Sequence, residues 1–268
     1  MKTFKNWIAF ITGLIYLIPF YILLNLSLKP DTDTSSVWML PKQLYPDNFI
    51  NAWVNAKLGR AFINNLVITF CVVSIVVIVG SFASYPLARY KTKINNFVYT
   101  LSVSCMIVPP LTALVPLYRL VANTFGTSTY PGIIIPHITY QLPMTIFLFT
   151  GFIASISREL DEAALLDGVN RFGIFFRIIF PLLKPVTSTV IIIVGVQIWN
   201  DYSFSIFFLQ RPEMRTITVA LAMFFSQYTN NISWVAAGCI MCAVPLVALY
   251  LFLQRYFIKG LSAGAVKG

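Results

Sequence analysis

The chain has 268 residues, of which 58% are hydrophobic and 10% charged, and its mean hydropathy is +0.78. Soluble domains carry about 25% charged residues, so the composition excludes an ordinary soluble enzyme and indicates a polytopic α-helical membrane protein. The net charge of +10 would suit a nucleic-acid ligand, but the basic residues gather in short segments beside apolar ones. We therefore expect no nucleic-acid partner.

Six apolar segments, each near the 20 residues that cross about 30 Å of hydrocarbon, follow one another along the chain. They predict one transmembrane domain over residues 1–268, with helices at 7–28, 62–88, 97–118, 133–154, 183–208 and 235–257. The first segment exceeds the ~7–15-residue core of a signal peptide, and no small-x-small cleavage site follows it. We therefore expect it to remain in the protein as an anchor.

Basic residues mark one side of the membrane. They occupy three short segments without acidic residues, which an even number of predicted helices separates: Lys2 and Lys5; Arg89, Lys91 and Lys93; Arg255, Lys259 and Lys267. Lysine and arginine accumulate in cytoplasmic loops. The pattern predicts that both termini face the cytoplasm.

Two segments differ from plain spans. Residues 29–61 form the longest segment on the outer side, and Trp38 and Tyr45 within it predict a partly ordered surface or interfacial hairpin. The run Met106–Leu111 contains two consecutive prolines, which remove backbone hydrogen bonds. This run favours a third span that is broken near a cavity.

The polar segment 155–182 lies on the cytoplasmic side and predicts two short helices. Ser155 or Ser157 can cap a helix that begins near Arg158. Three carboxylates fall in its first turns, where the helix dipole stabilises negative charge. Gly168 fits a left-handed cap at the end of this first helix.

Asn170 can begin the second helix, and Pro181 is expected to end it. Residues three or four positions apart predict one apolar stripe: Leu165, Val169, Phe172 and Phe176. Spacing alone leaves two interpretations. The segment is either an amphipathic connector on the inner membrane surface, with its charges solvated, or a knob presented to another protein.

The residue types favour the knob. They follow the pattern E-A-A, three residues, G, nine residues, I, one residue and then L-P, at Glu162, Ala163, Ala164, Gly168, Ile178 and Pro181. This segment resembles the EAA motif of ATP-binding-cassette importer permeases, except that Phe180 replaces the usual leucine. Asp167 and the Pro-Leu-x-x-Pro run at 181–185 match the extended form of sugar importers. The W-N-D-Y run at 199–202 and the closing residues 254–268 are similar to elements of maltose-type permeases.

The resemblance implies a type I importer permease fold with six transmembrane helices and a cytoplasmic coupling helix, in the cytoplasmic membrane of a prokaryote. It implies that the coupling loop, residues 155–182, docks into an ATPase subunit through Glu159, Glu162, Ala163, Ala164, Asp167, Gly168 and Pro181. It also implies that the tail reaches the interface of the ATPase dimer through Gly264, Lys267 and Gly268.

The implied partners are a second homologous permease, two ATPase subunits and an extracytoplasmic sugar-binding protein. The sequence lacks the phosphate-binding pattern G-x-x-x-x-G-K-[ST]. ATP and Mg²⁺ are therefore expected in the ATPase subunits, while this chain binds no cofactor or metal and catalyses no reaction. The function that follows is sugar import, with an oligosaccharide as the expected cargo, by alternating access.

Polar groups in the predicted helices are candidates for the sugar path. Charges at mid-membrane cost about 2.5–3.5 kcal/mol on insertion scales, which makes Asp201 conspicuous, and Gln197 is expected one helical turn below it. Hydrogen-bonding groups beside aromatic rings suit a sugar, and the candidates are Asn64, Asn65, Tyr140, Gln141, Gln197, Trp199, Asn200, Asp201 and Tyr202. An interfacial aromatic belt and polar contacts between helices also explain these residues.

An ion-coupled secondary transporter, which works without an ATPase, is the main alternative. Such a protein needs ion-binding or relay residues within the membrane, and Asp201 and His137 are a small supply. A membrane enzyme would need a cluster of His, Cys or carboxylate side chains at ligand spacing, which the sequence does not offer. His137 stands alone, which favours a structural hydrogen bond over a metal site.

Overall fold

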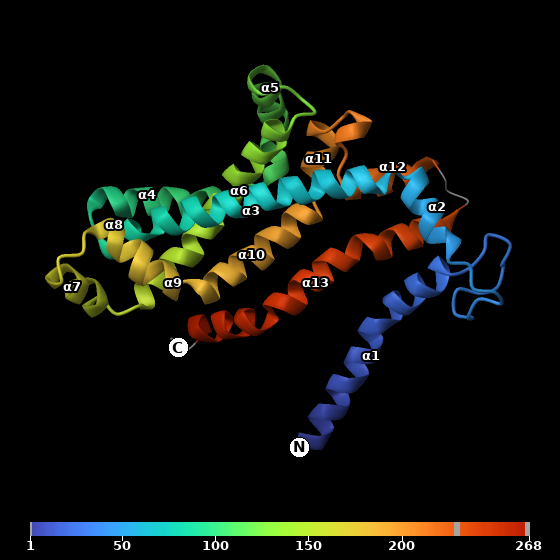
Figure 1. Ribbon diagram of the computed structural model, residues 1–268, viewed down its shortest axis with the longest axis horizontal. Helices are drawn as coiled ribbons and strands as arrows, with labels where there is room; N and C mark the ends of the chain where they lie inside the picture. The colour runs from blue at the N-terminus through green and yellow to red at the C-terminus, as the bar shows by residue number, and fades with distance from the viewer. Residues whose placement is uncertain (1, 228–230, 266–268) are drawn as a thin grey trace. The chain divides into compact units, whose positions relative to one another are not determined.

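A computed structural model describes residues 2–227 and 231–265 of the chain. Every regular element in these two ranges is a helix, which confirms the predicted all-α class. The chain divides into two compact units, unit 1 (Met1–Ile63 and Arg215–Pro245) and unit 2 (Asn64–Met214 and Leu246–Gly268). Helices α3 (Leu58–Arg89) and α13 (Ile232–Ala265) run from one unit into the other (Figure 1). That residues 1–268 act as a single transmembrane domain stays a prediction.

Unit 1 contains the first helix, the outer loop after it, and a small helical core. Its own helices are α1 (Lys2–Ser27), α2 (Asp47–Asn55) and α12 (Ile217–Gln227). The core forms from buried residues of α2, α12 and the first half of α13, among them Ala52, Phe224 and Ala237. A side chain at Gly238 would lie 2.7 Å from Leu221 Cδ2, so glycine permits α12 and α13 to pack closely.

Unit 2 contains the remaining elements. In chain order, these are α4 (Lys93–Ser104), η1 (Cys105–Ile107), η2 (Pro110–Ala113), α5 (Leu114–Thr124), α6 (Tyr130–Ser155), α7 (Glu159–Leu166), α8 (Arg171–Ile174), the π-helical turn η3 (Phe175–Ile179), α9 (Phe180–Leu182), α10 (Lys184–Trp199), α11 (Ser203–Phe208) and η4 (Pro212–Met214). Buried aliphatic residues of α3, α6 and α10 form its core. A side chain at Gly80 of α3 would overlap Thr145 of α6, so glycine also permits this close helix contact.

Four described helices are long and apolar enough to cross a membrane: Asn6–Ser27, Leu58–Arg89, Tyr130–Ser155 and Ile232–Phe252. Two bent helix pairs raise this number to six if each pair is one span. The predicted six spans correspond to this upper number. Among the described residues, no further helix is long and apolar enough to be a candidate span.

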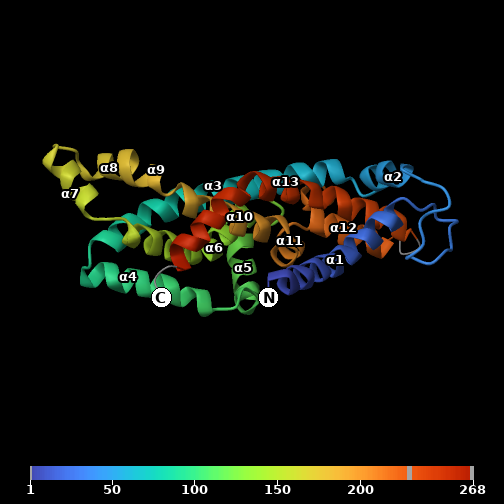
Figure 2. The same cartoon turned by 90° about the horizontal axis from the view of Figure 1, so that it is seen from below.

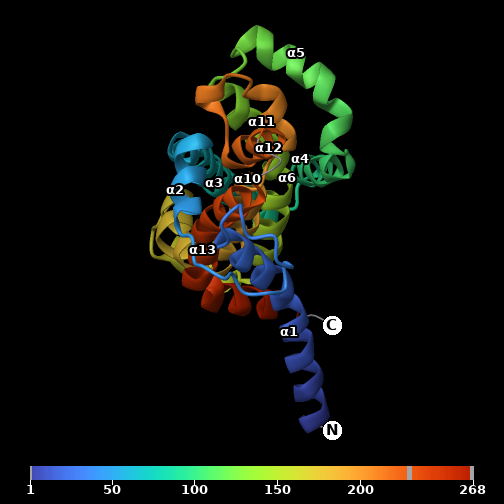
Figure 3. The same ribbon diagram turned by 90° about the vertical axis from the view of Figure 1, so that its right-hand side faces the viewer.

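The first bend confirms the break predicted at Met106–Leu111, and the second lies where the predicted span 183–208 begins. Lys93–Ile107 and Pro110–Thr124 meet at 92° (Figure 3), because consecutive prolines remove two N–H donors and Pro109 takes an extended backbone, with ψ of 131°. The predicted helix 183–208 differs from the structure. Its straight part is α10, which ends at Trp199 and meets the preceding helical segment at 71°.

Candidate functional site

Helix α7 occupies the middle of the predicted coupling loop. The Oγ of Ser157 accepts a hydrogen bond from the backbone N–H of Glu159 at 3.2 Å. The serine before the helix therefore satisfies one of its free N–H groups, as predicted. Ser155 instead donates to the carbonyl of Phe152 within α6. Figures 1 and 2 both place α7 at one end of unit 2, next to the ends of α3 and α6.

A glycine cap ends α7. Gly168 has a φ of +78°, the N–H of Val169 donates to the carbonyl of Ala164 at 2.9 Å, and the N–H of Gly168 donates to that of Leu165 at 3.0 Å. These two bonds define a Schellman motif, which confirms the predicted left-handed cap. A Cβ at Gly168 would meet nothing within 4 Å. The backbone conformation, not a lack of space, therefore requires glycine here.

The two faces of α7 differ in exposure. Asp161 and Ala164 are buried against unit 2. The residues predicted to contact an ATPase are exposed: Glu159, Glu162, Ala163, Asp167 and Gly168; Ala164 is the buried exception. Leu166 is 90% exposed between these carboxylates. Leu160 and Leu165 of the same helix are also exposed, at 43% and 52%. Exposed apolar patches mark contacts with another protein or a membrane.

Arg89, at the end of α3, fixes the start of the coupling loop. Its Nη1 donates to the carbonyl of Ile156 at 2.9 Å and its Nη2 to that of Ser157 at 3.4 Å. Its Nε lies 2.5 Å from Oδ2 of Asp161, and both side chains are largely buried. The guanidinium thus joins the second predicted span to the first turn of α7. Sequence reasoning missed this role, because Arg89 served there only as a topology marker.

The environment of Asp161 makes its charge dependent on Arg89. Burial raises the pKa of the Asp161 carboxyl above its usual range, while the Arg89 guanidinium opposes this rise. A carboxylate in such a position is stable in its charged form only with a nearby cation. The pair therefore acts as one structural unit at the base of the loop.

Aromatic contacts attach the second helix of the loop to α3. The ring of Phe82 lies 5.4 Å from that of Phe175 and stacks on Phe172 and Phe176 at 6.0 and 6.2 Å. The guanidinium of Arg171 lies 4.9 Å from the ring of Tyr90. The helix after α7 is therefore bound to the same end of α3 that holds Asp161.

One prediction for the second helix needs correction. Asn170 does cap it, accepting a hydrogen bond from Gly173 N–H at 2.8 Å, but Pro181 does not end it. The helical path continues through η3 and α9 and breaks at Leu183. Pro181 and Pro185 each lack the N–H that a helix needs for its hydrogen bonds, and prolines kink helices. The bend at Leu183 lies between these two prolines.

The predicted apolar stripe is only partly buried. Leu165, Phe172 and Phe176 are at least half exposed, although Phe172 and Phe176 stack on Phe82. Phe175 and Ile179, within the π-helical turn, are buried. Pro181 is exposed and lines an open hollow of about 450 Å³ together with Phe180, Lys184, Thr187 and Ser188.

The predicted tail contacts fall mostly beyond the described structure. Lys267 and Gly268 lie outside the described residues, and Gly264 lies in the last turns of α13. The role of these three residues at an ATPase interface stays a prediction.

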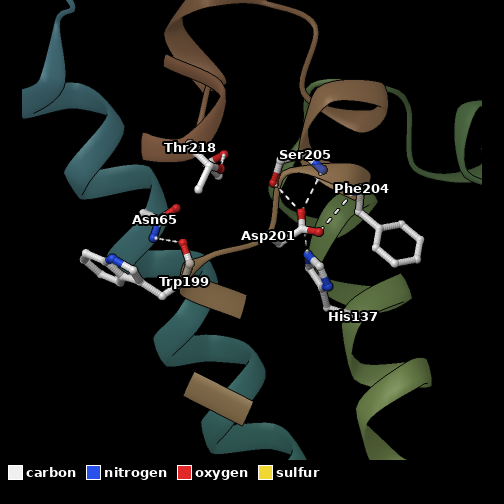
Figure 4. Close-up of polar contacts among 8 residues, drawn as sticks. Asn65, His137, Trp199, Asp201, Phe204, Ser205 and Thr218 are labelled. Carbon is white, nitrogen blue, oxygen red and sulfur yellow. Dashed lines mark hydrogen bonds and ion pairs between the residues drawn. The ribbon is translucent and has the colours of Figure 1, made fainter. Parts of the chain in front are cut away.

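The candidate sugar-path residues of α3 are engaged in structural hydrogen bonds. Asn64 is fully buried; its Nδ2 donates to the Glu213 carbonyl at 2.7 Å and its Oδ1 accepts from the Tyr130 hydroxyl at 2.9 Å. Asn65 donates to the carbonyl of Trp199 at 3.2 Å (Figure 4). These contacts match the alternative in which the asparagines hold helices together.

Asp201 caps α11. Its Oδ2 accepts from the N–H and the hydroxyl of Ser205, both at 2.8 Å, and its Oδ1 accepts from the N–H of Phe204 at 3.2 Å. His137 Nε2 lies 3.6 Å from the same carboxylate, and its ring lies against Phe204. Figure 4 shows the carboxylate between the His137 ring and the first turn of α11. His137 thus has a carboxylate neighbour.

Gln197 and Asp201 do not share a helix face as predicted. Helix α10 ends at Trp199, so Asp201 belongs to the turn that follows. Within unit 2, the exposed candidates are Gln197, Asn200 and Tyr202, while Tyr140 and Gln141 are partly exposed and Trp199 is buried. Among the described residues, no three His, Cys, Asp or Glu side chains gather as metal ligands would.

Comparison with known proteins finds sequence relatives that match most of the chain. Residues 76–263 match the family described as "Binding-protein-dependent transport system inner membrane component". The chain is 50% identical over 262 residues to the melibiose/raffinose/stachyose import permease protein MelC of Bacillus subtilis, covering 97% of this chain and 95% of that protein. It is 32% identical over 261 residues to the arabinooligosaccharides transport system permease protein AraQ of the same species, covering 96% and 92%.

A solved structure shares the fold. A chain from the crystal structure of a bacterial ABC transporter that imports the acidic polysaccharide alginate superposes with a TM-score of 0.81, covering 96% of this chain and 97% of that one. Its sequence identity is 19%, so this likeness bears on the fold alone.

Proposed function

This chain belongs to the family of binding-protein-dependent transport system inner membrane components, and from that premise we propose that it is the permease subunit of an ATP-binding-cassette importer for an oligosaccharide. The observation that carries the proposal is helix α7. It presents Leu166 and several carboxylates outward, while Arg89 and Asp161 fix its inner face to α3. A helix held in this way can transmit the movement of a bound partner to the membrane helices.

The proposed mechanism is alternating access. Two ATPase subunits bind ATP and Mg²⁺, and their closure moves α7 together with the loop. The Arg89–Asp161 pair and the aromatic contacts of Phe82 carry this motion to α3. A second, homologous permease completes the pathway, and an extracytoplasmic binding protein delivers the sugar. Both termini of this chain face the cytoplasm.

The sugars in the name of the 50% identical relative, melibiose, raffinose and stachyose, are the first candidates for the cargo. Asn64, Asn65 and Asp201 are engaged within the protein, which leaves Gln197, Asn200 and Tyr202 as the exposed candidates for contact with sugar. An amide and an aromatic ring offer hydrogen bonds and an apolar surface to a sugar.

Uptake by the assembled transporter in proteoliposomes tests this proposal. With the binding protein outside, we expect raffinose uptake to require ATP inside the vesicles and to continue when proton and sodium gradients are collapsed. The control is a set of vesicles with ADP in place of ATP.

The ion-coupled alternative predicts the reverse dependence. Uptake that persists without ATP and disappears with the ion gradient would reject the cassette mechanism. The contact between His137 and Asp201 is the one feature named above that such a mechanism could use.

A further inference from the structure

The loop after α1 folds back along the helix instead of extending away from it. The side-chain amide of Asn25 donates to the carbonyls of Val37 and Met39, both at 2.6 Å. The hydroxyl of Tyr21 donates to the carbonyl of Trp38 at 2.9 Å. Three consecutive loop carbonyls therefore bond to the last turns of α1, beside which Figure 1 shows the loop.

These bonds fix the depth of the loop. Tyr21 lies six residues before the end of α1 at Ser27, which corresponds to about 9 Å along the helix axis. Residues Asn6–Ser27 form a candidate membrane span. The backbone of residues 37–39 is thus bonded to side chains that lie about 3 Å (Asn25) and about 9 Å (Tyr21) along the axis from the end of a candidate membrane-spanning helix. Interfacial segments are buried to about 5–10 Å.

The side chains at this depth are apolar and uncovered. Trp38, Met39 and Leu40 are 58%, 62% and 72% exposed. Phe20 and Leu24, which precede the anchoring residues Tyr21 and Asn25 on α1, are exposed as well. The loop and the end of α1 that holds it thus both expose apolar side chains.

The turn before residues 37–40 holds polar and charged groups. Buried Lys29 donates to both the hydroxyl and the carbonyl of Ser35 and to the carbonyl of Ser36. Hydrogen bonds from Ser35 hold the pKa of Asp33 at about 2, so this carboxylate stays charged, and it also accepts from the Lys42 N–H at 3.3 Å. Charged residues therefore flank residues 37–40 on both sides in the chain, as suits a segment at the edge of the hydrocarbon.

We propose that residues 37–40 are a lipid-binding element, which inserts into the boundary between the headgroups and acyl chains beside the outer end of α1. In hydrocarbon, an unsatisfied carbonyl costs several kcal/mol. The structure meets this requirement, because helix side chains satisfy the carbonyls of residues 37, 38 and 39. Tryptophan and tyrosine are also the residues that accumulate at this boundary. The inference concerns lipid contact and stands apart from the transport function.

A fluorescent label measures the depth directly. In the assembled transporter, with the native cysteines replaced, an NBD label on Trp38→Cys is placed in vesicles with lipids that carry a nitroxide near the headgroup. We expect quenching by these lipids about threefold stronger than for the same label on Thr34→Cys, as suits a segment at the interface. Thr34 is the matched control, since it is exposed on the charged turn of the same loop.

Two variants test the hydrogen bonds. Asn25→Ala frees two carbonyls, and we expect it to move the label toward water and raise quenching by aqueous iodide. Tyr21→Phe frees one carbonyl with little risk to folding, and we expect a smaller shift in the same direction. Quenching of label 38 by iodide rather than by lipid in the unchanged background would overturn the proposal. So would quenching by neither, which would mean that another protein chain covers residues 37–40.

Discussion

Gly168→Val is expected to reduce ATP-driven uptake about tenfold or more while membrane insertion stays normal. An L residue in the left-handed conformation costs about 1–2 kcal/mol, and a β-branched one is a stronger outlier. The φ of +78° at Gly168 is needed for the two bonds that close the end of α7. The substituted turn should open, turning α7 away from its partner. Uptake in proteoliposomes and co-purification of the ATPase measure the loss.

Gly168→Asn is the matched control for this substitution. Asparagine tolerates the left-handed conformation better than other non-glycine residues, and open space surrounds the position. We expect it to retain most of the uptake. If asparagine and valine impair transport equally, the requirement is for a small surface against the partner and not for the turn.

Arg89→Ala is expected to reduce coupled transport as severely as Gly168→Val does. It removes two hydrogen bonds to the loop backbone and leaves Asp161 without its cation. Removing one partner of a buried ion pair costs about 3–5 kcal/mol. We expect the coupling loop to detach from α3, so that ATP hydrolysis by the assembled transporter continues without sugar uptake. The ratio of sugar imported to ATP hydrolysed is the measurement.

Asp161→Asn removes the ion pair and keeps the hydrogen bonds of Arg89 to the loop backbone. The arginine can still donate to the carbonyls of Ile156 and Ser157, so we expect a milder loss than for Arg89→Ala. Arg89→Ala combined with Asp161→Asn removes the unpaired charge and should recover part of the coupling ratio. Equal losses in all three variants would mean that the pair has no specific role in holding the loop.

Sequence reasoning predicted the helix caps of the loop at 155–182 because their signals are local. Asn170 and Gly168 act through hydrogen bonds to residues within five positions, and such caps can be read from residue type and spacing. Arg89 could not be found in this way. It lies more than sixty residues from the carbonyls that it binds, and a basic residue at the end of a span already has an explanation in topology.

The sugar path stays a prediction, because the sequence pattern allows two explanations for each of its residues. A polar residue in an apolar helix indicates that it needs a partner, but not whether that partner is cargo or protein. Asn64 and Asn65 find theirs in backbone carbonyls far along the chain. The predicted placement of Asp201 on the same helix face as Gln197 was wrong because the end of the helix was misplaced. The hydropathy of residues 183–208 is continuous, whereas the backbone turns after Trp199 and gives Asp201 a helix cap to make.

Cross-linking measures whether α7 contacts an ATPase subunit. A photoreactive amino acid replaces Leu166, which is 90% exposed on α7, or Leu101, which is 54% exposed on α4. Irradiation of the assembled transporter should join position 166 to an ATPase subunit, and position 101 should give no such product. A transport-active complex in which position 166 never cross-links to an ATPase subunit would contradict the account.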